Sequence, residues 1–470
     1  MGRVCRWGVV PLVVLCASLS WLPRGAAQES KADRLWRVEL DRMQIRMADG
    51  DYEGALVVAK KFEEEFDDKK RRLNTPELRA SADVIRQAGV WSHIARGVCE
   101  KNCGHYRIAR GRLELAESKL SENRRLYGQQ FAIVLGQYQA SQAAQAWAVV
   151  IDDQLAWRIE RWRQQRLRPM LDAMSNAVYE TELSQMLVYD GLATLCVDES
   201  MPLRMESAKL LSKAEGYFDL AQEIRERNFQ GLTSSFTIHG DQQATFFRNY
   251  GRLFLKRAEL KLERPETPED DRLVDLLERS DDYLARAFKE FSSWQFMIDE
   301  MRQLAHEGSI AVANKAMKKK LQEKQMGDAE IEAFLRDVKT ICVGYADLCF
   351  NVAELRIVQA KVAADDKDTS QVTAHLDEAE QMLLNGADML AVVTPQADHP
   401  YLVMCYAETA AVAAMRAILL NEELRDDLAQ YLDMGKEIMQ KRHLDSETVQ
   451  GRYLARAEDL CRRARAKAGQ

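Results

Sequence analysis

Glycine and proline are scarce in this chain, whose 470 residues include 23 glycines and 9 prolines. Alternation of apolar and polar residues with a period of two, which is typical of half-buried strands, is almost absent. These shortages exclude a collagen-like or low-complexity chain and disfavour a β-sheet protein. Apolar residues make up 47% of the chain and recur three and four positions apart, as on the buried face of a helix. We therefore expect an all-α protein.

Motifs for nucleophilic catalysis and for phosphate binding are also missing. The sequence contains no G-x-S-x-G elbow, no His-Glu-x-x-His and no G-x-x-x-x-G-K-[ST]. Neighbouring acidic residues occur in runs, but adjacent residues of a helix point apart and form a solvated face rather than an acid/base pair. We expect a protein that is not an enzyme and has no cofactor.

The N-terminal segment has the pattern of a secretory signal. Two arginines precede an apolar stretch over residues 7–22, and residues 25–27 supply small side chains for cleavage. Residues 1–27 are therefore predicted to be a signal peptide, with a secreted or periplasmic mature chain that starts at Gln28. An uncleaved anchor is the alternative, although this stretch is shorter than the roughly 20 residues that cross a bilayer.

The remaining chain has neither a membrane-spanning segment nor a basic character. Its most apolar stretch, residues 403–420, is interrupted by Glu408 and Arg416, so we expect no membrane span in the mature chain. Loss of the three arginines of the signal moves the net charge from −7 to −10. A chain of this charge has no general affinity for a phosphate backbone, which disfavours nucleic acid as a partner.

Turn signals divide the mature chain into three predicted regions. Residues 28–121 and 241–470 have helices of ordinary length that alternate with turns. Residues 122–240 depart from this rhythm, because no proline or turn cluster interrupts residues 122–167. That stretch is either one long helix or two helices that meet near Asp152 and Asp153. Residues 231–240, rich in hydroxyl and β-branched side chains, are predicted to form an irregular loop.

Small and aromatic residues recur with a definite spacing beside the turns. Gly97, Ala109 and Ala116 stand twelve and seven positions apart. A second segment has the order aromatic, large, small, aromatic at Phe247, Tyr250, Gly251 and Phe254. Both segments resemble tetratricopeptide repeats, whose 34-residue helix pairs touch through small side chains. The resemblance implies a TPR-like α-solenoid of stacked antiparallel helix pairs, irregular in the middle, that acts as a protein-protein interaction scaffold.

A cationic stripe gives this scaffold a candidate partner-binding site. Arg248, Arg252 and Lys256 follow one another at intervals of four and therefore share one face of a helix. In tetratricopeptide repeats the first two of these positions face the concave groove, where cationic or amide residues hold the carboxylate of a peptide. The resemblance thus implies a protein or peptide partner with an acidic segment or a free carboxylate. A screened surface stripe is the alternative.

A group of thiols and imidazoles keeps a second class of function open. Thiolate and imidazole suit zinc, but the spacing of His93, Cys99, Cys103 and His105 fits no common zinc motif. The alternative functions are a metal-dependent sensor or enzyme using the Cys99–His105 region, or a purely structural envelope component. We expect no metal site and expect most of the seven mature cysteines to be buried. A disulfide between Cys99 and Cys103 stays open.

Arginine and tryptophan also gather near the middle of the chain. Five arginines between residues 158 and 168 accompany Trp157 and Trp162. Arginine stacks on tryptophan, and such a patch is suited to anionic ligands. The exposed end of an amphipathic helix is the simpler interpretation.

Overall fold

The computed structural model is entirely helical in the part of the chain that it describes, where no strand occurs. The all-α class predicted from composition and periodicity is therefore confirmed for these residues. The predicted signal peptide and residues 231–239 of the predicted loop lie outside them. The described residues are 31–71, 82–151, 153–201, 203–204, 206–229, 240–265, 271–292, 328–393 and 398–468.

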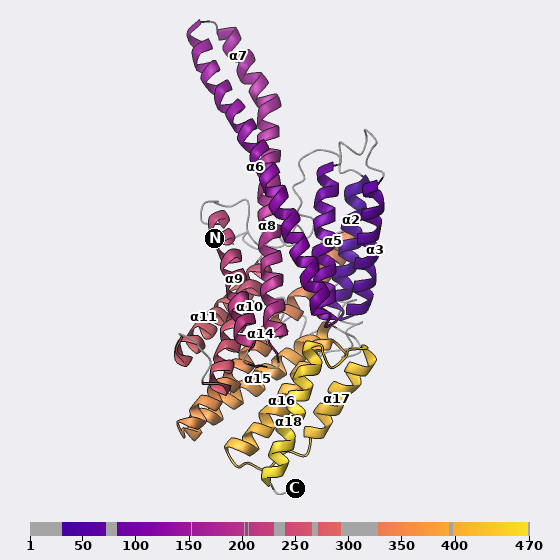
Figure 1. Ribbon diagram of the computed structural model, residues 1–470, viewed down its shortest axis with the longest axis vertical. Helices are drawn as coiled ribbons and strands as arrows, with labels where there is room; N and C mark the ends of the chain where they lie inside the picture. The colour runs from indigo at the N-terminus through magenta and orange to yellow at the C-terminus, as the bar shows by residue number, and fades with distance from the viewer. Residues whose placement is uncertain are drawn as a thin grey trace, which may run out of the picture.

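The described helices pack mainly against helices close to them in sequence (Figure 1). In chain order they are α2 (Lys31–Ala48), α3 (Tyr52–Arg71), α5 (Ala82–Asn102), α6 (Tyr106–Ile151), α7 (Asp153–Trp162), the π-helix η1 (Arg163–Leu167), α8 (Arg168–Glu199), α9 (Ser207–Phe229), α10 (Gly240–Glu263), α11 (Leu273–Ser292), α14 (Asp328–Asp365), α15 (Thr369–Val393), α16 (Pro400–Leu419), α17 (Leu428–Lys441) and α18 (Val449–Ala468).

Two glycines form turns between helices. Gly50 separates α2 from α3 and Gly104 separates α5 from α6, with φ angles of 71° and 81°. Side chains with a Cβ rarely adopt this left-handed conformation, whereas glycine adopts it without steric cost. Gly50 also lies directly against Pro400, the first residue of α16. The first turn thus connects the N-terminal hairpin to a helix far away in the sequence.

Small residues let the helices of a pair approach closely. A Cβ added to Gly97 on α5 would lie 2.8 Å from the Cγ of Leu113 on α6. A Cβ added to Gly251 on α10 would lie 2.9 Å from the Cγ of Leu284 on α11. Ala109 has no exposed surface at the first contact. The close approach predicted at Gly97, Ala109 and Gly251 is therefore present.

The same contact geometry recurs in a third pair. A Cβ on Gly251 would also lie 3.2 Å from the carbonyl oxygen of Ser280 on α11. On α15, a Cβ on Gly386 would lie 3.2 Å from the carbonyl oxygen of Ala346 on α14. These distances leave no room for a larger side chain, so each pair is fixed at a short interhelical distance.

The long middle helices differ from the predicted division of the chain. α6 runs without interruption from Tyr106 to Ile151, so the boundary predicted after residue 121 falls inside this helix. α7 begins at Asp153, which confirms the alternative of two helices over residues 122–167. No breaker lies near residue 121, and helical hydrogen bonding therefore continues through it.

α6, α7, η1 and the start of α8 form an antiparallel arm that projects from the rest of the molecule (Figure 1). Leu120 on α6 belongs to the main hydrophobic core, and Leu183 on α8 packs against it. No described residue between these two positions in the sequence contributes to that core. We call residues 121–182 the arm and the remaining helices the body. The α6 half of the arm extends about 45 Å at a rise of 1.5 Å per residue.

The π-helix η1 interrupts the half of the arm that returns to the body. Pro169 is the second residue of α8 and has no N–H to donate to the carbonyl of Gln165, so the regular hydrogen-bond pattern cannot continue. The wider turn keeps Arg163 and Leu167 buried against α6. The exposed side chains before and after the π-helix are thereby rotated relative to each other.

One helix of the described part has the length and hydropathy to cross a membrane. This helix is α16, and 72% of its most apolar window is buried inside the body. It packs against α15, α17 and α18, and its Glu408 has no exposed surface.

Candidate partner-binding surfaces

The cationic stripe of α10 lies against neighbouring helices. The Nη1 atom of Arg248 is 2.9 Å from Oδ2 of Asp347 on α14, and Nη1 of Arg252 is 2.7 Å from Oδ1 of Asp198 on α8. Their side chains are 12% and 14% exposed. Both arginines therefore join α10 to other helices of the body and present only their edges to solvent.

The third residue of the stripe, Lys256, is completely buried. Its Nζ lies 3.0 Å from Glu259 and 2.6 Å from Glu354, and Tyr453 donates a hydrogen bond of 2.7 Å to Glu354. Burial opposes the positive charge, but the two carboxylates hold the pKa of Lys256 above its usual value. In this arrangement Lys256 contacts no solvent, and its charge stabilises the junction of α10, α14 and α18. The capture of a partner by the stripe stays a prediction.

The thiols and imidazoles of α5 and its turn are separated by other partners. His93 lies 3.1 Å from Glu63 and 2.8 Å from Lys119, whereas His105 lies 2.7 Å from Glu100. No group of three or more metal-ligating side chains gathers in the described part of the chain. The Cys99–His105 region therefore does not bring its four candidate ligands together around one point.

All seven described cysteines are free, and six of them are buried. The predicted burial of most thiols is confirmed. Burial and nearby carboxylates raise the pKa of Cys103 to about 12, and burial raises that of Cys99 further. Such thiols carry almost no thiolate at neutral pH.

Glu63 is the centre of a buried ionic cluster between α3, α5 and α6. It pairs with Arg96 and Arg112 and lies next to His93. Burial alone would raise the pKa of Glu63, but hydrogen bonds from His93 and Arg96 and the charge of Arg112 lower it to about 2. The cluster fixes the first helix pair against the base of the arm.

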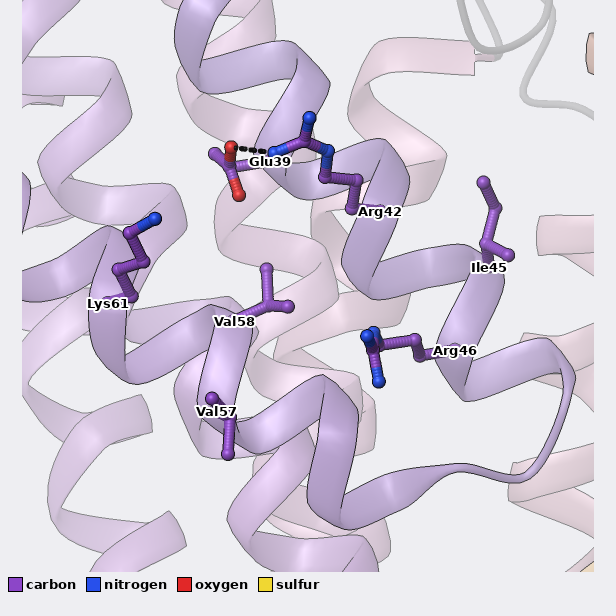
Figure 2. Close-up of a pocket in the computed structure, with 7 residues that line it drawn as sticks. All are labelled: Glu39, Arg42, Ile45, Arg46, Val57, Val58 and Lys61. Atoms are coloured by element: carbon purple, nitrogen blue, oxygen red, sulfur yellow. Dashed lines mark hydrogen bonds and ion pairs between the residues drawn. The ribbon is translucent and has the colours of Figure 1, made fainter.

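An open groove lies between α2 and α3 on the surface of the N-terminal hairpin. It has a volume of about 430 Å³. Ile45 and Val57 are 41% and 66% exposed there, although both are large apolar side chains. Figure 2 shows Arg46 reaching from α2 toward the two valines of α3. The residues that line the groove are Glu39, Arg42, Ile45, Arg46, Val57, Val58 and Lys61.

Cationic side chains surround this apolar floor. Arg42 pairs with Glu39 at 2.6 Å and Arg46 pairs with Asp51 at 2.6 Å, but both guanidinium groups stay accessible, with side chains 61% and 49% exposed. Glu39 is the one carboxylate among the lining residues, against three cations. The groove therefore combines exposed apolar surface with an excess of positive charge.

A pattern of buried and exposed residues on α3 marks this groove in the sequence. Ala55 and Ala59 are four apart and buried, so they mark the face of α3 that packs inward. Val57 lies halfway between them and points to the opposite side of the helix. A valine on the solvent side of an amphipathic helix is the pattern that indicates such a surface.

Comparison with known proteins finds no match for this chain among protein-family models, curated proteins or solved structures.

Proposed function

We propose that this protein is an exported, non-catalytic scaffold of tetratricopeptide-like type that binds a protein or peptide. The solenoid arrangement and the export are part of the proposal. The repeated close contacts of α5 with α6, α10 with α11 and α14 with α15 support a common design of helix pairs. The buried thiols and dispersed histidines favour a binding role over catalysis or metal sensing.

The groove between α2 and α3 is the single observation that carries the proposal. Its floor offers exposed apolar surface at Ile45 and Val57, which a monomer gains nothing by exposing. Its rim adds Arg42, Arg46 and Lys61. A peptide that places an apolar side chain on the floor and a carboxylate at the rim satisfies both features by burial and charge-assisted hydrogen bonds.

Selection from a phage-displayed library of random peptides on the immobilised protein tests this role. We expect enriched peptides to combine a carboxylate with a large apolar residue. Val57→Glu should weaken the selected peptides about tenfold or more, because it buries a carboxylate against the apolar anchor and repels the peptide's own carboxylate. Fluorescence anisotropy with labelled peptides measures the affinity.

Val274→Glu is the matched control, since Val274 on α11 is 56% exposed and lies outside the groove. This variant should bind the selected peptides like the unmodified chain. Failure to enrich any peptide, or equal binding by the two variants, would contradict the groove as a recognition site and favour a purely structural role.

A further inference from the structure

The returning half of the arm, which consists of α7, η1 and the start of α8, exposes aromatic side chains to solvent. Trp157 and Trp162 are 59% and 51% exposed, whereas Ala156 and Leu167 of the same half of the arm are buried against α6. Leu155 is 44% exposed and lies seven residues before Trp162, so these two share one side of α7. Trp157 lies on a different side. The exposed apolar surface of the arm thus faces more than one direction.

Exposed arginines accompany the tryptophans. Arg158, Arg161 and Arg166 are exposed, and among the described side chains no carboxylate lies within ion-pair distance of them. The guanidinium of Arg161 lies 5.2 Å from the centre of the Trp157 ring. Arg168 is also exposed, and it pairs with Asp172 at 3.1 Å. Three arginines of the returning half of the arm are therefore available to an external anion.

The part of α6 that packs against α7 contributes no opposing charge. Residues 128–151 of α6 contain no aspartate, glutamate, lysine or arginine, and they expose Ile133 and Val149 by 62% and 56%. Residues 154–171 contain five arginines and one glutamate, in a chain whose net charge is −7. Residues 154–171 therefore carry a local excess of positive charge at a distance from an acidic body, whereas residues 121–182 as a whole balance seven arginines with seven carboxylates.

We propose that the arm binds an anionic lipid surface, with Trp157 and Trp162 at the level of the headgroups and Arg158, Arg161 and Arg166 on lipid phosphates. Tryptophan favours the membrane–water interface, and the planar guanidinium group matches the geometry of a phosphate. The length of the arm keeps the acidic body away from a surface of the same charge. This surface is separate from the groove of α2 and α3 and does not depend on it.

Two features favour lipid over other occupants. A second copy of this chain would bring two arginine-rich helical segments together, and their like charges repel. A rigid protein that covered Trp162 would leave Trp157 in water, whereas mobile headgroups surround both sides of a thin arm.

Co-sedimentation of the full chain with large unilamellar vesicles tests the proposal. We expect binding to equimolar phosphatidylcholine and phosphatidylglycerol, weaker binding at high salt, and little binding to phosphatidylcholine alone. Replacing Arg158, Arg161 and Arg166 by glutamine should lower the partition coefficient about a hundredfold, given roughly 1 kcal/mol for each cation near an anionic surface. Trp157→Ala combined with Trp162→Ala should lower it about tenfold or more.

A matched control removes three arginines elsewhere. Arg462, Arg463 and Arg465 are exposed on α18, at the end of the molecule opposite the arm (Figure 1). Their replacement by glutamine changes the net charge equally and should leave vesicle binding unchanged. Circular dichroism confirms that the variants keep their helical content. The proposal is overturned if anionic vesicles do not bind, if the control variant loses as much binding as the arm variant, or if sedimentation velocity assigns the arm to a dimer that the arm variant abolishes.

Discussion

At the scale of single residues, buried charges connect helices that are far apart in the chain. Glu63 on α3 meets Arg96 on α5 and Arg112 on α6. Lys256 on α10 meets Glu354 on α14 at 2.6 Å. Removal of one partner leaves the other charge buried without compensation, so each pair makes the stability of the body sensitive to substitution or to pH.

Glu63→Gln should separate this pH dependence from that of the other carboxylates. The pKa of Glu63 is about 2 in the folded chain and 4.5 when unperturbed. Its contribution, about 3 kcal/mol at most, is therefore complete above pH 4.5 and is lost as the pH falls toward 2. The difference in unfolding free energy between the unmodified chain and the variant should narrow by about 2 kcal/mol between pH 5 and pH 3. Urea unfolding at several pH values measures this difference.

Glu64→Gln serves as the control, because Glu64 is an exposed neighbour on the same helix. Its difference from the unmodified chain should stay nearly constant over the same pH range. A Glu63→Gln difference that does not change with pH would show that the cluster does not hold Glu63 ionised in the folded state.

The stripe on α10 shows what the residue pattern of a single helix cannot predict. Cations at intervals of four mark one helix face, and Arg248, Arg252 and Lys256 do share a face. Their partners Asp347, Asp198 and Glu354 lie far away in the sequence. A pattern within one helix cannot distinguish a face that is open to a ligand from one that meets carboxylates of another helix.

At the scale of elements, helix pairs depend on glycines that no larger residue can replace. Gly97→Ala should destabilise the chain by about 1–3 kcal/mol, because the new methyl group would lie 2.8 Å from Leu113. Gly111→Ala on α6 is the matched change, since a Cβ there would meet nothing within 4 Å. This variant should be more stable by about 0.5–1 kcal/mol through reduced unfolded-state entropy.

Chemical denaturation monitored by circular dichroism compares the two alanine variants. Similar midpoints for both would contradict the close approach of α5 and α6. The spacing of small residues and the resemblance to tetratricopeptide repeats predict this contact, because a small residue is needed wherever two backbones approach. The boundary predicted after residue 121 lies inside α6, because the sequence has no breaker at that point.

At the scale of the whole molecule, the body and the arm differ in how they are stabilised. Most of the body shares one large core, which receives side chains from helices on both sides of the arm in sequence. α2 and α3 pack against α5 in smaller clusters of their own. The arm is packed only along the contact between its two helical halves, where Val134, Ala148 and Ala156 are buried. The absence of breakers predicts the long helices of the arm, but not that they leave the core, because that depends on packing between residues far apart in the sequence.

Truncation of the arm tests most directly the proposal of a self-sufficient helical scaffold with separate contact surfaces. Residues 128–177 are replaced by a short glycine-rich turn, and thermal unfolding is followed by circular dichroism. We expect one cooperative transition within a few degrees of that of the full chain, because the removed residues contribute nothing to the main core. Loss of the transition, or a body that no longer folds, would contradict the division of the molecule into body and arm.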